Sequence, residues 1–223
     1  MSTRRIASLA VCVPLATMLF AGCKGQLPPE ERTDDGLVRV PSRASGGVYR
    51  NLEANFTQYK RVMIEPLTIE FRPEWRRQHP EVDDAELRRI QNEAVKLFRE
   101  EFIEVLVDEG PYELTEVREP DVMVVVPRVL DLDIPAPDAG VEPGVRSYAP
   151  HPVKMQLNGE LRDAMNGAVL LRVIMFEGQE RYGFGELRLA NRVTNAHEFR
   201  VGFTKWSRLV REALDIAKVA PPR

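Results

Sequence analysis

Two segments of this chain carry apolar residues at the three- and four-residue spacing of an amphipathic helix. The first follows Asp83-Asp84-Ala85-Glu86, which has the pattern of a capping box, and stops at Gly110-Pro111. The second follows Asn195, which has Glu198 three residues after it, and ends before Pro221. We therefore predict two helices that each bury one face. The apolar stripes are Leu87, Ile90, Ala94, Leu97, Phe98, Phe102, Val105 and Leu106, and then Phe199, Phe203, Trp206, Val210, Ala213, Leu214 and Ala217.

Strand patterns lie on both sides of the first helix. Residues 61–71 are rich in β-branched side chains, and Pro66 among them indicates an edge position or a bulge because proline cannot donate to a ladder. Residues 112–117 predict a short strand. Residues 121–134 predict a longer one that is apolar on both faces at first, as in a central strand, and then alternates so that one face becomes solvated.

A β-hairpin is predicted before the second helix. Residues 154–163 alternate between apolar and polar, Asn166-Gly167 is a strong turn signal, and residues 168–177 form the return strand. The prolines and glycines of residues 135–152 predict a long loop. This order of elements predicts an α+β fold: a two-layer sandwich of a mixed, mostly antiparallel sheet with both amphipathic helices on one face. The opposite face carries polar side chains, so it is solvated or covered by loops or another subunit.

The N-terminal segment has the pattern of a bacterial lipoprotein signal. Arg4 and Arg5 precede an apolar run at residues 6–20, and Ala21-Gly22-Cys23 is a small-residue cleavage site that ends in a thiol. An uncleaved membrane anchor is the alternative, but the run is shorter than the roughly 20 residues that span a bilayer. We predict that residues 1–22 are removed and that Cys23 carries fatty acyl chains. By resemblance to Gram-negative lipoproteins, Lys24 in place of Asp predicts an outer-membrane destination, facing the periplasm.

The predicted anchor divides the chain into three parts: a signal peptide at 1–22, a flexible tether at 23–48 and a periplasmic α+β domain at 49–223. The tether is rich in Pro, Gly, Ser and charge. The alternative is that residues 37–40 add a short strand to the domain.

Charge and cysteine content narrow the function classes. The chain has a formal net charge of −3 and becomes more acidic once Arg4 and Arg5 are removed, which argues against nucleic acid or anionic lipid headgroups as partners. Cys12 leaves with the signal peptide and Cys23 is acylated, which excludes disulfides, thiolate metal sites and cysteine catalysis in the mature chain. We expect no cofactor.

Two groups of side chains are candidates for contact with a ligand or partner. Arg72, Trp75, Arg76 and Arg77 interleave an aromatic ring with cations, an arrangement that could stack a base or a sugar or cover an acidic partner. The alternative is a tryptophan at the rim of the core with arginines around it.

Asp131 and Asp133 are two apart on one strand, so they would share a face and could bind a divalent cation or form a carboxylate pair. The alternative is a strand whose end reaches solvent.

Gly183-Phe184-Gly185 lacks the third glycine of a dinucleotide fingerprint and is interpreted as a turn. No metal-ligand spacing joins the three histidines, which are His79, His151 and His197.

Several short motifs follow one another along residues 36–219. They are Gln58-Tyr59-Lys60-Arg61-Val62-Met63-Ile64-Glu65-Pro66, Arg88-Arg89-Ile90, Pro120-Asp121-Val122, Leu161-Arg162-Asp163, Asn191-Arg192-Val193-Thr194-Asn195, Lys205-Trp206 and Leu209-Val210-Arg211-Glu212-Ala213-Leu214. In this order and spacing they resemble a family of proteobacterial lipoproteins that is classified as a domain of unknown function (DUF3313). The resemblance implies a lipid-anchored envelope protein and implies no reaction, cofactor or catalytic residue.

The sequence thus favours an outer-membrane lipoprotein whose domain binds or assembles with other envelope components and performs no catalysis. It is attached to the membrane through acyl chains, and self-association through the polar sheet face is one form of assembly. Two alternatives stay open: an enzyme acting on cell-wall or polysaccharide substrates, and a small-ligand carrier with residues 135–152 as a lid.

Overall fold

The apolar stripes and alternating strands assemble into two layers, a sheet and a pair of long helices. The computed structural model describes residues 32–135, 147–149, 153–178 and 188–220. The strands are β1 (Val38–Val40), β2 (Gly47–Arg50), β3 (Arg61–Ile64), β4 (Thr68–Phe71), β5 (Glu113–Leu114), β6 (Val122–Asp133), β7 (Ser147–Ala149), β8 (Lys154–Asp163), β9 (Val169–Glu177) and β10 (Arg188–Ala190). The helices are η1 (Phe56–Gln58), α1 (Trp75–Gln78), α2 (Asp84–Ile103), η2 (Glu104–Asp108) and α3 (Arg192–Val219).

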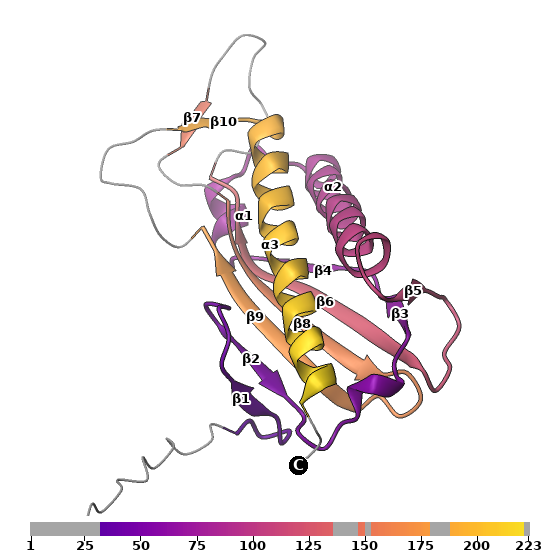
Figure 1. Ribbon diagram of the computed structural model, residues 1–223. Coiled ribbons are helices and arrows are strands. Elements are labelled where there is room, and N and C mark those ends of the chain that lie inside the picture. The colour runs from indigo at the N-terminus through magenta and orange to yellow at the C-terminus, as the bar shows by residue number, and fades with distance from the viewer. Residues whose placement is uncertain (1–31, 136–146, 150–152, 179–187, 221–223) are drawn as a thin grey trace, which may run out of the picture. The chain divides into compact units, whose positions relative to one another are not determined.

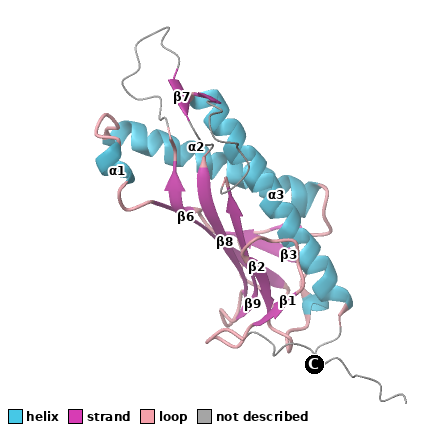
Figure 2. Cartoon of the chain, turned by 90° about the vertical axis from the view of Figure 1, so that its left-hand side faces the viewer, coloured by secondary structure: helices cyan, strands magenta, loops and turns pink. Residues whose placement is uncertain are grey.

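The main sheet has the order β1-β2-β9-β8-β6-β3-β5, with β4 also beside β6 (Figure 1). All pairs are antiparallel except β3 with β5 and β3 and β4 with β6. Both α2 and α3 cover the same face of this sheet (Figures 1 and 2). The predicted α+β sandwich, with a mixed and mostly antiparallel sheet, is therefore confirmed.

The core lies between the sheet and the two helices. Phe98 and Phe102 of α2 contact Trp206 of α3, with ring centroids 5.9 and 5.1 Å apart. Trp206 lies against Gly159 of β8, where a Cβ atom would come within 2.3 Å of the indole Cζ2. The indole N–H donates to the carbonyl oxygen of Val173 at 3.3 Å. Glycine at position 159 therefore lets a buried tryptophan lie directly on the centre of the sheet.

The predicted strand at residues 61–71 is divided by Pro66 into β3 and β4. Both halves pair in parallel with β6, β3 with its first part and β4 with its second. β6 is fully buried at its start and alternates later, as the change of pattern along residues 121–134 indicates.

The N-terminal boundary of the folded part lies earlier than residue 48. Val38 and Val40 of β1 pair with Arg50 and Val48 of β2, and β2 in turn pairs with β9. Leu37 and Val38 are buried. The alternative of a strand at residues 37–40 is therefore correct, and the expected tether up to residue 48 is too long. Three- and four-residue strands show too few positions to reveal a period.

α3 begins four residues earlier than predicted. Its N-cap is Asn191, whose side chain accepts a hydrogen bond from the backbone N of Thr194 at 3.0 Å. The Thr194 hydroxyl accepts one from the backbone N of Asn191 at 2.9 Å. This reciprocal pair satisfies two donors at the helix start and replaces the expected cap at Asn195 and Glu198. For α2 the predicted cap is correct, because the Asp83 side chain accepts from the backbone N of Glu86 at 2.7 Å.

The predicted loop at residues 135–152 contains β7, which pairs with β10 just before α3. The rest of that loop lies largely outside the described residues. None of the helices in the described ranges has both the length and the apolar character needed to cross a membrane.

Candidate functional site

Trp75 of the predicted aromatic and cationic group is completely buried. Its indole N–H donates to the carbonyl oxygen of Ile134 at 2.9 Å. Its ring packs against Phe71 and His79, with centroid distances of 4.5 and 4.8 Å. A tryptophan whose ring and N–H are both occupied in this way has no open face on which to stack a base or a sugar. The geometry matches the alternative interpretation, a tryptophan that closes the core below α1.

The three arginines around Trp75 form ion pairs with nearby carboxylates. The Nε atom of Arg72 lies 3.3 Å from an oxygen of Asp133, although its hydrogen is not aligned for a hydrogen bond. Arg76 pairs with Asp84, and Arg77 lies 3.4 Å from Glu74. The Arg76 and Arg77 side chains are 54% and 78% exposed, so solvent screens both ion pairs and they contribute little to stability.

Asp131 and Asp133 lie where β6 loses its regular alternation. Asp131 has a φ angle of 50°, and the register with β8 shifts between Leu130 and Asp133. Because such an irregularity changes the direction in which a side chain points, a spacing of two no longer places two carboxylates on one face. Asp131 is exposed, whereas Asp133 is half-buried beside Arg72. The regular geometry of β6 therefore does not place the two carboxylates of the predicted pair side by side.

The remaining sequence candidates have ordinary surroundings or fall outside the described ranges. The Nδ1 atom of His79 lies 3.0 Å from a Glu81 carboxylate oxygen, and His197 is exposed on the second turn of α3. Among the described residues no group of three or more His, Cys, Asp or Glu side chains could hold a metal ion. Cys23, His151 and Gly183-Phe184-Gly185 are not among them.

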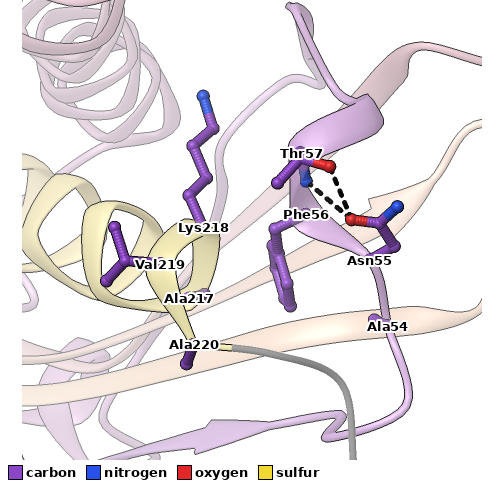
Figure 3. A pocket seen from close by; sticks show the side chains of 8 residues that line it. All are labelled: Ala54, Asn55, Phe56, Thr57, Ala217, Lys218, Val219 and Ala220. Carbon is purple, nitrogen blue, oxygen red and sulfur yellow. Dashed lines mark hydrogen bonds between the residues drawn. The ribbon is translucent and has the colours of Figure 1, made fainter.

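A small groove of about 150 Å³ separates η1 from the last turn of α3 (Figure 3). Asn55 and Thr57 lie on one wall, and both the backbone N and the hydroxyl of Thr57 donate to the Asn55 side chain, at 3.1 and 2.7 Å. Lys218 on the other wall places its ammonium 4.1 Å from the centre of the Tyr112 ring. The polar side chains of the groove thus have partners, Asn55 and Thr57 in each other and Lys218 in the Tyr112 ring.

The sheet face opposite the helices carries a continuous ion-pair network. Arg172 of β9 and Arg162 of β8 each donate from Nε to Glu160 at 2.9 Å. Arg172 also donates to Asp35, which precedes β1. Burial disfavours the charge of Glu160, but the hydrogen bonds from Arg162 and Arg172 outweigh it and lower the pKa of its carboxyl. The Asp35 carboxyl also has a lowered pKa, because it accepts hydrogen bonds from Thr33 and Arg172.

The sequence analysis did not predict this ion-pair network, although the sequence of the hairpin contains the information needed to do so. The Asn166-Gly167 turn fixes the hairpin register, and that register places Glu160 directly opposite Arg172. Half-buried apolar side chains lie on the same face as the network: Val126 and Leu130 of β6, and Ile174 and Phe176 of β9. We call this side of the sheet, which lies opposite α2 and α3, the open sheet face.

Asp163, at the end of β8, holds the hairpin turn to the segment before β3. Its carboxylate accepts from the Tyr59 hydroxyl at 2.8 Å and from the backbone N atoms of Met165 and Asn166 at 2.8 and 3.0 Å. Burial opposes the charge, but these donors outweigh it and lower the pKa of Asp163. Burial and the neighbouring Asp163 raise the pKa of Tyr59 to about 12.

Other residues of the short motifs also make structural contacts. Arg61 donates from Nε to Asp121 at 3.0 Å, which joins β3 to the start of β6. Arg211 of α3 donates from Nη1 to the carbonyl oxygens of Val105 and Glu109, at 3.1 and 3.3 Å. These bonds satisfy carbonyls at the end of η2. Tyr59, Asp163 and Trp206 belong to the same motifs, so these motif residues specify the fold.

Searches of known structures and proteins give distant similarities. The PelC dodecamer from Paraburkholderia phytofirmans is similar over 71% of this chain and 97% of its own, with 11% identity and a TM-score of 0.34. A neuraminyllactose-binding hemagglutinin homolog from Helicobacter pylori is similar over 74% of this chain and 84% of its own, with 8% identity and a TM-score of 0.35. These values are too low to support an inference about function. No curated protein matches the chain.

The family comparison gives a firm result. The model of the family described as "Protein of unknown function (DUF3313)" matches residues 32–210, a range that begins at the first described residue and extends into the second half of α3. The chain therefore belongs to the DUF3313 family.

Proposed function

We propose that this chain is a lipid-anchored protein of the bacterial outer membrane, with a periplasmic domain that binds or assembles with other envelope proteins. The observation that carries the proposal is the pattern of residues 4–23: two arginines, an apolar run too short to span a bilayer, and a cysteine after Ala21-Gly22. Two or more acyl chains on one cysteine give stable membrane attachment to a domain that needs no membrane span of its own.

The open sheet face supports the second half of the proposal. The helices cover one side of the sheet, and the other side presents Glu160, Arg162 and Arg172 next to the half-buried Ile174 and Phe176. A surface with charged pairs beside apolar side chains resembles the mixed composition of non-obligate protein interfaces. A second copy of this chain is the simplest partner to test.

Anchoring is tested by following the protein from precursor to mature form. In wild-type cells we expect the mature N-terminus to be an acylated Cys23, which intact-mass measurement identifies, and the protein to partition into detergent. Cys23→Ser should abolish acylation, and globomycin should cause the unprocessed form to accumulate. Unchanged mass and partitioning after Cys23→Ser would reject the anchor.

Assembly is tested with a photo-crosslinking amino acid on each face of the domain. Asn158 is a half-buried position of β8 on the open sheet face, and Lys96 on α2 is 74% exposed and serves as the control. We expect defined crosslinked species from position 158 in intact cells and few from position 96. If both positions give only the monomer, the open sheet face is a solvated surface and this half of the proposal fails.

A further inference from the structure

The end of the domain where the chain enters from the proposed anchor is defined by three segments. These are the loop at 115–121, the hairpin turn at 163–168 and the last turn of α3, and we call them together the tether end. The backbone N of Ala164 donates to the carbonyl oxygen of Val122 at 3.2 Å, which joins the turn to the end of the loop. The segment after β2 reaches the last turn of α3 at the groove in Figure 3.

The first described residue also belongs to this end. Arg32 forms an isolated antiparallel β-bridge with Val38 of β1, and Val38 lies opposite Arg50 of β2. The next residue, Asn51, donates its backbone N to the carbonyl oxygen of Leu170, just after the hairpin turn. In Figure 1, β1 and the last turn of α3 accordingly lie at the same end of the domain, and β7 and β10 at the other.

Exposed apolar side chains are concentrated at the tether end. Seven large apolar side chains are exposed among the described residues, and two of them, Tyr148 of β7 and Val193 of α3, lie at the far end. Three lie in the segments named above: Val117 is 58% exposed, Met165 61% and Val219 83%. The remaining two, Leu114 and Ile216, flank these segments. Exposed apolar side chains gathered in one region mark a contact surface more often than scattered ones do.

Chain length limits which end of the domain can face the bilayer. Arg32 lies nine residues after Cys23, and nine residue steps span at most about 30 Å. α3 has 28 residues and is therefore about 42 Å long. Suppose that α3 stood perpendicular to the membrane with its N-terminal end on the lipid surface. Arg32, near the C-terminal end of α3, would then lie farther from the membrane than the segment between Cys23 and Arg32 can reach.

We propose that the tether end rests on the lipid surface that holds the acylated Cys23, with Val117, Met165 and Val219 at the level of the headgroups. This inference depends on the proposed lipid anchor. The charges around these side chains are of both signs, with Glu116 and Glu119 beside Arg118 in the loop and Lys218 beside Val219. The contact therefore comes from the anchor and from apolar insertion, without a requirement for anionic lipid.

Single reporters on the full, acylated protein test the orientation. Once Cys23 is acylated the mature chain has no other thiol, so Val117→Cys, Met165→Cys and Val219→Cys can each carry one environment-sensitive fluorophore. Val193→Cys is the matched control, because Val193 is 78% exposed on the same helix as Val219 but at the far end. The proteins are reconstituted into vesicles of phosphatidylethanolamine and phosphatidylglycerol, with and without brominated acyl chains.

We expect a blue shift and loss of emission to brominated lipid at positions 117, 165 and 219, and neither effect at 193. Water-like emission from all four reporters, or quenching at 193 instead, would overturn the inference. A blue shift that is already present in the Cys23→Ser protein without vesicles would assign the surface to a protein contact and also overturn it. If the wild-type protein does not bind to the vesicles at all, the proposed lipid anchor is refuted. Binding to the vesicles without quenching at positions 117, 165 and 219 refutes only the proposed orientation.

Discussion

Replacement of Asp163 by Asn is expected to destabilise the domain by about 1.5–3 kcal/mol at neutral pH. The Asp163 carboxylate accepts one hydroxyl and two backbone N–H groups, all at 2.8–3.0 Å. Asparagine keeps one oxygen for the turn but presents an amide NH₂ group to Tyr59 and removes the charge, so roughly one charge-assisted hydrogen bond is lost. A loss of this size is a large fraction of the about 5–15 kcal/mol that stabilises an ordinary domain.

The pH dependence of this effect has a definite sign. The pKa of Asp163 is lower in the folded than in the unfolded chain. Its contribution to stability is therefore complete above the unfolded pKa of about 3.9 and is lost as the pH falls through the folded value. The difference between wild type and Asp163→Asn should be constant near neutrality and should shrink below pH about 4.

Urea unfolding followed by far-ultraviolet circular dichroism, on the Cys23→Ser background, measures both expectations. Asp34→Asn is the control, because it removes an exposed carboxylate from the same chain. Tyr59→Phe, alone and combined with Asp163→Asn, gives the coupling between the two side chains. Equal stability of wild type and Asp163→Asn, or a difference that grows in acid, would refute the assigned role of Asp163.

Three further changes test the core and a helix end. Trp75→Phe removes the N–H bond to Ile134 and part of the ring volume and should cost about 1–3 kcal/mol in calorimetry; an unchanged melting temperature would contradict a core role. Gly159→Ala forces a Cβ atom against Trp206 and should cost about 1–3 kcal/mol and alter the near-ultraviolet dichroism, whereas an unaltered spectrum would show that the sheet has space there. Arg211→Lys loses the two-carbonyl contact at the end of η2 and should cost about 1 kcal/mol and speed amide exchange in η2; unchanged exchange would argue against it.

Sequence reasoning predicted the helices, the hairpin and the two-layer arrangement because each depends on a local period. Short strands and helix starts were harder to predict. β2 has four residues and no visible alternation, and the start of α3 depends on Asn191 and Thr194, whose pairing competes with the equally plausible pattern at Asn195. In both cases the deciding interaction involves too few residues to stand out from neighbouring patterns.

The candidate site was harder to predict than the fold, and Trp75 illustrates the reason. A tryptophan among arginines has the same sequence pattern whether its ring is exposed or buried. The Trp75 ring is buried because its N–H donates to the carbonyl of Ile134, 59 residues later, and because Phe71 and His79 pack on the ring. The carboxylates at 131 and 133 depend in a similar way on a register shift that no spacing rule reveals.

The ion-pair network on the open sheet face limits how a partner could bind there. Glu160 already accepts from two guanidinium groups, and Arg172 is shared between Glu160 and Asp35. A partner that offered only charge would find these groups paired, and one that covered them with apolar surface would leave them desolvated at a cost of several kcal/mol. Favourable binding energy would therefore come mainly from the neighbouring Ile174 and Phe176, while the charged network would select a partner with matching polar groups. On this reasoning, assembly through the open sheet face should depend only weakly on salt, and strong salt dependence would place the contact elsewhere.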